Sequence, residues 1–245
     1  MSERLRTVVV MAVTVLVAGV CLEYLPSSPL RGTFRQHSYR LNAEVAATTE
    51  GPHAWVMTQP GDRDRPVSYD PCRPVEVLVN PDGGPAEGPD LVRSAIARVN
   101  QATGLDLQYA GASDERPAWV DGNRPVPRSG PAEPVLVSWA TQAEVPQLAG
   151  DVAGVAGSVA RADRSGRLRF ITGQVTLDSE AFGQLAGERD GDERMRAVVL
   201  HEFGHLVGLA HVKDAGELMN AKLRVLDFGP GDLEGLALLG RGGCH

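Results

Sequence analysis

Residues 201–211 read His-Glu-Phe-Gly-His-Leu-Val-Gly-Leu-Ala-His, and this stretch holds three of the six histidines in the chain. Apolar residues at helical spacing lead into it from Asp192, which predicts that the stretch begins inside a helix. His201 and His205 are four residues apart, so on a helix their rings project from the same face, one turn apart. Both imidazoles can therefore bind a single metal ion.

The rest of the stretch completes a candidate catalytic zinc site. Gly208 can take the left-handed conformation that ends a helix, so the chain can bend back and His211 can supply a third nitrogen. Three neutral imidazoles leave the fourth position of a tetrahedral zinc open to water or substrate. Glu202, beside the first ligand, can reach that water and act as general base. A purely structural zinc is disfavoured, because such sites use thiolates or four closed ligands, and no fourth ligand is evident nearby.

This pattern, His-Glu-x-x-His-x-x-Gly-x-x-His, resembles the signature of the metzincin metallopeptidases, which a methionine turn follows. Glu217-Leu218-Met219-Asn220 would be that turn, and the short spacing from His211 to Met219 is most similar to the matrixin branch. The resemblance implies that Met219 packs beneath the three ligands as a soft apolar support. It also implies one catalytic zinc ion and hydrolysis of peptide bonds in proteins or peptides.

Several residues depart from the matrixin pattern. Val212 stands where matrixins usually have Ser, and Asn220, Ala221 and Leu223 replace the Tyr, Pro and Tyr that typically follow the methionine. In matrixins the positions after the methionine shape the pocket for the residue after the scissile bond. The cysteine-switch propeptide motif is absent. Substrate preference and latency are therefore not transferred, and calcium has no support in the sequence.

Hydrophobic patterning predicts strands that alternate with helices over residues 70–245, which indicates one α/β domain. The predicted strands are Val75–Asn80, Leu105–Tyr109, Val135–Trp139, Gly157–Ala162 and Leu168–Leu177. A helix is predicted after an N-cap at Asp90, another leads into His201, and a short last one covers Asp232–Leu239.

The metzincin resemblance adds the arrangement of these elements. It implies a zincin-like fold with a twisted, mostly parallel five-stranded sheet, an antiparallel edge strand, an active-site helix and a C-terminal helix. In that fold an edge strand above the site binds an extended substrate by backbone hydrogen bonds. Gly157–Ala162 is the candidate for this strand, although its apolar residues would equally suit a strand that only packs on the core.

The N-terminus predicts export. Arg4 and Arg6 precede an apolar run over residues 7–22, so residues 1–22 form either a signal peptide or a membrane anchor with the arginines left in the cytoplasm. The run is slightly short of the roughly 20 residues that span a bilayer, and no clean cleavage site follows it. Residues 23–69 lack periodicity and are expected to be a Pro-rich linker or stalk. A secreted or membrane-anchored extracellular protein is expected.

Two of the three cysteines remain outside the leader. Cys72 and Cys244 form an even pair, and an oxidising compartment favours a disulfide between them. The alternative is that one thiolate blocks the catalytic metal in a latent form, and the residues around Cys72 do not decide between the two.

Composition excludes some functions and leaves three open. The net charge of −7 and the lack of a basic block disfavour nucleic acid as a partner. The first hypothesis is a monomeric extracellular endopeptidase, and the second keeps the hydrolysis for another amide, such as a cell-wall peptide. The third is a catalytically silent, zinc-bound recognition module. Glu202 argues against that third hypothesis, because a binding module needs no general base.

Overall fold

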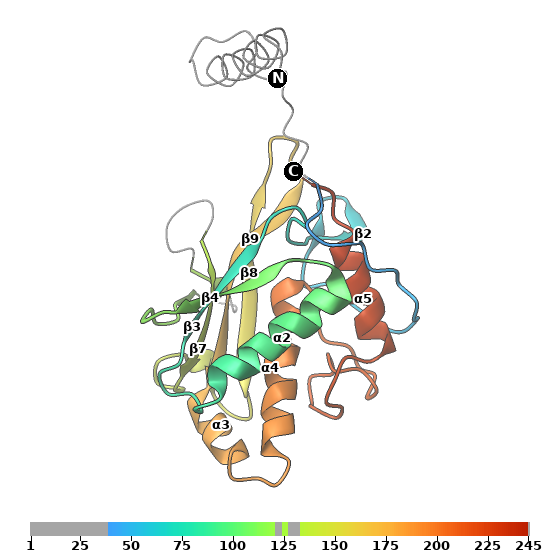
Figure 1. Cartoon of the computed structure of the whole chain (residues 1–245). Coiled ribbons are helices and arrows are strands. Elements are labelled where there is room, and N and C mark those ends of the chain that lie inside the picture. Colours follow the sequence, from blue (N-terminus) through green and yellow to red (C-terminus); the bar gives the residue numbers. More distant parts are fainter. Residues whose placement is uncertain (1–38, 121–123, 127–132, 245) are drawn as a thin grey trace, which may run out of the picture. The chain divides into compact units, whose positions relative to one another are not determined.

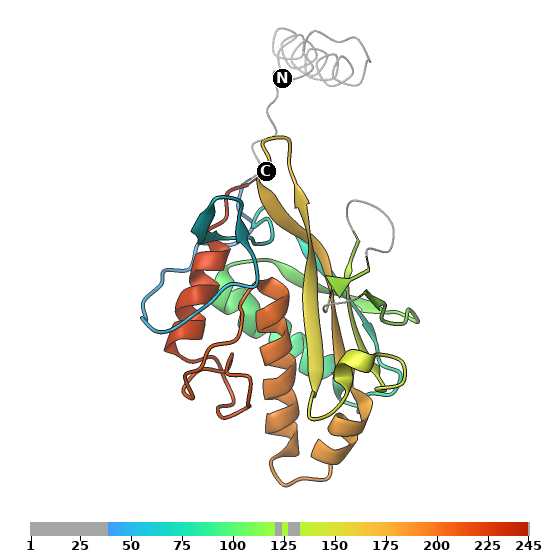
Figure 2. The same cartoon turned by 180° about the vertical axis from the view of Figure 1, so that it is seen from behind.

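A five-stranded sheet is the framework of the computed structural model, which describes residues 39–120, 124–126 and 133–244 (Figures 1 and 2). The strand order is β4-β3-β7-β9-β8; β3 pairs in parallel with β4 and β7, β7 pairs in parallel with β9, and β8 runs antiparallel to β9. The strands are β3 (Val75–Asn80), β4 (Leu107–Ala112), β7 (Val135–Ala140), β8 (Gly154–Ala162) and β9 (Leu168–Asp178). The predicted fold, a mostly parallel sheet with an antiparallel edge strand, is confirmed.

Burial explains why the patterning located these strands. Every residue of β7 is buried, as expected for a continuous apolar strand in the middle of a sheet covered on both faces. β4 begins at Leu107, two residues later than predicted, because the Asn100 side chain bonds both the N–H and the C=O of Leu107. Leu105 donates its N–H to the hydroxyl of Thr103, the last residue of the preceding helix, so Leu105 is held to the end of that helix rather than in the strand.

Helices α2 (Gly88–Thr103) and α4 (Gly191–Val207) lie side by side against one face of the sheet, and α5 (Pro230–Gly240) packs next to them (Figure 1). Their apolar side chains share one core with the sheet. The N-cap predicted at Asp90 is wrong: the helix begins at Gly88 and Asp90 lies in its first turn, where it pairs with Arg93. The predicted helix before His201 and the predicted C-terminal helix are both present.

The remaining elements are short. They are α3 (Ser179–Leu185), the 3-10 turn η1 (Pro146–Leu148) and two small hairpins, β1 (Thr58–Gln59) with β2 (Asp62–Pro66) and β5 (Trp119–Val120) with β6 (Arg124–Pro125). The sequence analysis did not predict α3. Asp178 begins it by accepting hydrogen bonds from the N–H groups of Glu180 and Ala181.

The described part of the expected linker, residues 39–69, is built into the domain. Leu41 donates its N–H to the carbonyl of Pro71, Asn42 bonds the carbonyl of Leu105, and Val67 lies fully buried in the core. The expectation of a stalk is wrong for these residues, because hydrogen bonds to distant parts of the domain hold the segment, and such bonds leave no trace in hydrophobic periodicity. The domain therefore begins before residue 70.

The two cysteines outside the leader are far apart in the sequence but lie together in space, Cys72 just before β3 and Cys244 after α5. Cys72 and Cys244 are joined in a disulfide that closes a sequence separation of 172 residues. The expected signal peptide or anchor, residues 1–22, lies outside the described residues. Within the described ranges, none of the helices has the length and apolar character needed to cross a membrane.

Candidate metal centre

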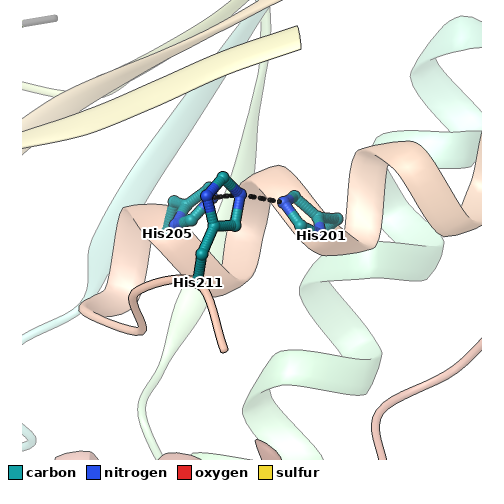
Figure 3. Close-up of side chains that lie close together, drawn as sticks. All are labelled: His201, His205 and His211. Carbon is teal, nitrogen blue, oxygen red and sulfur yellow. Dashed lines mark hydrogen bonds between the residues drawn. The ribbon is translucent and has the colours of Figure 1, made fainter. Parts of the chain in front are cut away.

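The three histidines predicted as ligands converge on one point (Figure 3). His201 and His205 project from consecutive turns of α4, which ends at Gly208 with φ of 128°. The chain then turns back, so that Nε2 of His211 lies 3.1 Å from Nε2 of His201 and 3.0 Å from Nε2 of His205. Only glycine adopts this φ readily, so Gly208 is what allows the third ring to approach from outside the helix.

Backbone carbonyls fix the orientation of two of the rings. Nδ1 of His201 lies 2.7 Å from the carbonyl oxygen of Leu218, and Nδ1 of His205 lies 2.8 Å from that of Leu209. A ring that donates a hydrogen bond from Nδ1 keeps a lone pair on Nε2 for a metal. A metal-binding histidine usually has such a hydrogen bond from its other ring nitrogen to a carbonyl or carboxylate oxygen. The donor set and its geometry therefore fit a zinc ion.

Burial also favours the neutral form of these rings. Burial lowers the pKa of His201 to about 4 and the pKa of His205 to about 3, and it lowers the pKa of the more exposed His211 as well. Neutral imidazoles are the form that binds zinc, so no proton has to leave these side chains at neutral pH.

Glu202 is the buried carboxylate of the site. Its side chain lines the same cleft as His201 and His211, yet the residue is only 6% exposed, and its Oε2 has no hydrogen-bond partner among the described residues. Burial raises the pKa of Glu202 to about 8. A buried, unpaired carboxylate is costly unless a cation or a reacting group compensates it, so this atom also fits a metal site.

Two carboxylates that the sequence analysis left without a role hold the turn beneath the histidines. Oδ2 of Asp232 accepts from the N–H groups of Leu218 and Gly229 at 2.6 and 3.0 Å, and burial raises the pKa of Asp232 to about 6. Glu217 accepts from the N–H groups of Gly231 and Asp232. These bonds fix the turn whose Leu218 carbonyl orients His201. Asp232 lies at the predicted start of the last helix, where an acidic residue is expected, but the sequence offered no such signal for the role of Glu217.

Met219 is 1% exposed and packs against α4 between two ligands. A Cβ atom added to Gly204 would lie 2.5 Å from Sδ of Met219, so only a glycine at this position lets the sulfur approach the helix. The methionine thus lies where a support for His201 and His205 would lie, on the helix segment that carries both.

His201 and His211 line a cleft of about 900 Å³. Besides α4, its walls are formed by α3, by residues 150–154 and by residues 220–223. The candidate substrate strand, Gly157–Ala162, is part of the edge strand β8, but the cleft reaches only the first residue of β8 and the loop before it. The predicted position of Gly157–Ala162 in the edge strand is confirmed, and its role in binding substrate stays a prediction. The residues after Met219 that depart from the matrixin pattern do line the cleft.

Comparisons with known proteins agree with the motif. Residues 132–233 match the family model Peptidase_M10, described as Matrixin. This range includes the three histidines, Glu202 and Met219, and it confirms the resemblance to the metzincins. A search of curated proteins gives no match.

Three solved structures are similar to the chain at low identity. Archaemetzincin from Methanopyrus kandleri aligns with a TM-score of 0.42 and 16% identity, over 66% of this chain and 93% of its own. Metalloproteinase-II from Bacteroides fragilis has a TM-score of 0.34 and 15% identity, over 74% and 54%. A GM1-bound AB5 holotoxin named ECX has a TM-score of 0.41 and 16% identity, over 70% and 81%. At these scores, nothing about substrate or activity transfers from the three structures.

Proposed function

We propose that this metzincin-type zinc metallopeptidase is an exported endopeptidase in which His201, His205 and His211 bind Zn²⁺ and Glu202 is the general base. The observation that carries the proposal is the convergence of three Nε2 atoms in an open cleft, with a buried and unpaired carboxylate beside them. Three ligands with an open fourth position are typical of catalytic zinc rather than structural zinc.

The residues divide the chemistry between them. When bound, zinc would polarise the scissile carbonyl and lower the pKa of the attacking water toward about 7. Glu202 would take the proton of that water and pass it to the leaving amine. The Leu218 and Leu209 carbonyls keep His201 and His205 in the tautomer that presents Nε2. An extended peptide would lie along the edge of β8, whose first residue, Gly154, lines the cleft.

Export is supported by the apolar run near the N-terminus and by the cysteine pair. A disulfide persists in oxidising compartments, so the Cys72–Cys244 bond is consistent with a protein that works outside the cytoplasm. We propose a monomer that acts on protein or peptide substrates and has no nucleic-acid partner. Attachment to a membrane through residues 7–22 is the alternative to cleavage of the leader.

Hydrolysis of another amide, such as a cell-wall peptide, is the second candidate, because the cleft residues 220–223 differ from the matrixin pattern. A silent recognition module is disfavoured. Burying Glu202 without a partner costs stability, and a module that only binds would gain nothing from that cost.

The test uses the full chain purified from an oxidising host compartment. We expect close to one zinc per chain by elemental analysis, cleavage of an unfolded protein, loss of cleavage with a chelator and recovery when zinc is returned. A quenched peptide library then gives the sequence preference. A purified chain that holds no zinc would contradict the assignment of the metal site. A zinc-loaded chain that cleaves cell-wall peptide but no protein would select the second candidate.

A glycine substitution tests whether the position of Glu202 matters. A Cβ atom at Gly154 would lie 2.8 Å from Cγ of Glu202, and the backbone of Gly154 does not have a positive φ. Gly154→Ala should therefore displace the base alone and lower kcat by roughly 10- to 100-fold at unchanged zinc content. Gly183→Ala is the matched control, because a Cβ there meets nothing within 4 Å. Equal activity of the two variants would contradict the assigned position of the base.

A further inference from the structure

Residues 49–57, which we call the strap, connect the C-terminal helix to the metal centre. At their beginning, Thr49 donates its hydroxyl to the carbonyl of Pro230 at 2.8 Å, and Gly51 donates its N–H to Oε2 of Glu234 at 2.9 Å. Gly51 also lies against the backbone of Gly231, where an added Cβ would come within 2.6 Å of the nitrogen. The strap is thus fixed to α5 before it reaches the metal-binding segment.

Beyond this anchor the strap pairs with the three residues that precede His211. Val56 donates its N–H to the carbonyl of Gly208 at 3.0 Å, and Ala210 donates its N–H to the carbonyl of Ala54 at 2.8 Å. Trp55 and Leu209 face each other in the antiparallel bridge between these two bonds. Residues 208–210 therefore leave the helix and enter a short β pairing with a distant part of the chain.

The strap bonds lie on both sides of the Leu209 carbonyl, which orients His205. The two strap bonds flank Leu209, and the carbonyl of Leu209 is the acceptor for Nδ1 of His205. The N–H of Leu209 bonds the carbonyl of Gly204, which lies in α4. Without the strap, the carbonyl of Gly208 and the N–H of Ala210 would lose these partners, and His211 would follow a segment held mainly from the side of α4.

We propose that the strap is a positioning element of the metal centre, which fixes His211 and the Leu209 carbonyl in the geometry that retains zinc. The proposal rests on the proposed zinc site. A ligand segment that moves freely must be ordered each time the metal binds. Loss of a hydrogen bond that orients a metal ligand typically weakens metal binding by about 10- to 100-fold. Loss of the strap should therefore act mainly on how long the metal stays bound.

The decisive variant removes one strap hydrogen bond and keeps the rest of the chain. Val56→Pro deletes the N–H that bonds Gly208, whereas Val56→Ala keeps that N–H and shortens a side chain that is 47% exposed. The readout is the rate at which the zinc-loaded full chain releases zinc to a chromophoric chelator. We expect Val56→Pro to release zinc at least about 10-fold faster than Val56→Ala, which should match the native chain.

A second pair of variants separates positioning from general loss of stability. Gly51→Ala should lift the strap from α5 and speed zinc release in the same direction, by a smaller factor, even if Val56→Pro does not fold. Val79→Ala leaves a cavity in β3, a core strand separated from β8 by β7 and β9, and should lower the unfolding temperature without changing the release rate.

The outcomes are distinct. Equal release rates for Val56→Pro, Gly51→Ala and Val56→Ala, with zinc bound in all three, would overturn the role of the strap and leave the zinc site standing. If Val79→Ala released zinc as fast as the strap variants at the same loss of stability, faster release would follow from instability alone. That result would overturn the proposal as well. A native chain without zinc would overturn the zinc site and the role of the strap together.

Discussion

Replacing Glu202 with Gln is expected to lower kcat by about 10²- to 10⁴-fold while zinc content stays the same. The amide keeps the size of the carboxylate but cannot accept a proton from the attacking water. The native Oε2 has no hydrogen-bond partner among the described residues, so few other contacts are at stake. The measurement is kcat on a quenched peptide, together with zinc per chain and the unfolding temperature.

The pH profile should separate loss of the base from a loss of fold. The ionised carboxylate is the active form, so native kcat/KM should rise as pH rises through the pKa of Glu202. Burial raises that pKa to about 8, and a bound cation would lower it. The Glu202→Gln variant should lack this limb. Glu180→Gln, an exposed carboxylate in the same cleft, is the matched control and should keep both rate and profile. Residual activity of Glu202→Gln equal to that control would refute Glu202 as the base.

Removing the disulfide by Cys72→Ser together with Cys244→Ser should lower the free energy of unfolding by about 5 kcal/mol, the entropy of closing a loop of this length. The bond spans a sequence separation of 172 residues and ties the segment just before β3 to the last residues of the domain. Denaturant unfolding of the oxidised chain and of the double variant measures the difference.

Arg241→Ala serves as the control for that comparison. It removes an ion pair with Glu44 near the same chain end, but both side chains are about half exposed, so the loss should stay below about 1 kcal/mol. Equal unfolding of the native chain and the double variant would contradict a stabilising disulfide. A Cys72 thiol that reacts with a labelling reagent in the folded, exported chain would overturn the pairing itself.

The sequence predicted the convergence of the three histidines because the geometry that brings them together is local. Spacing of four residues on a helix is enough to bring His201 and His205 together, and a glycine three residues later is enough to end that helix. Continuous apolar runs likewise predicted the inner strands, because a strand that is buried on both faces has apolar residues at nearly every position.

Elements that depend on distant backbone atoms could not be predicted from the sequence. α3 has only seven residues and begins because Asp178 caps it at the end of a strand, so no long periodicity marks it. Main-chain groups of residues 39–69 bond the Glu234 carboxylate of α5, β9 and residues 208–210, and a main-chain group places almost no restriction on side-chain type. Such a segment therefore has the composition of a linker.

The stretch from His201 to His211 is enough to predict that three imidazole nitrogens converge and that the carboxylate of Glu202 lies near them, because helical spacing fixes relative positions within a turn or two. The contacts that hold these side chains in place come from the tertiary structure. The Leu218 carbonyl, the carboxylates of Glu217 and Asp232, and the strap all reach the site through contacts between residues far apart in the chain. Long-range contacts of this kind are fixed by packing and backbone pairing in space, and no periodicity along the sequence encodes them.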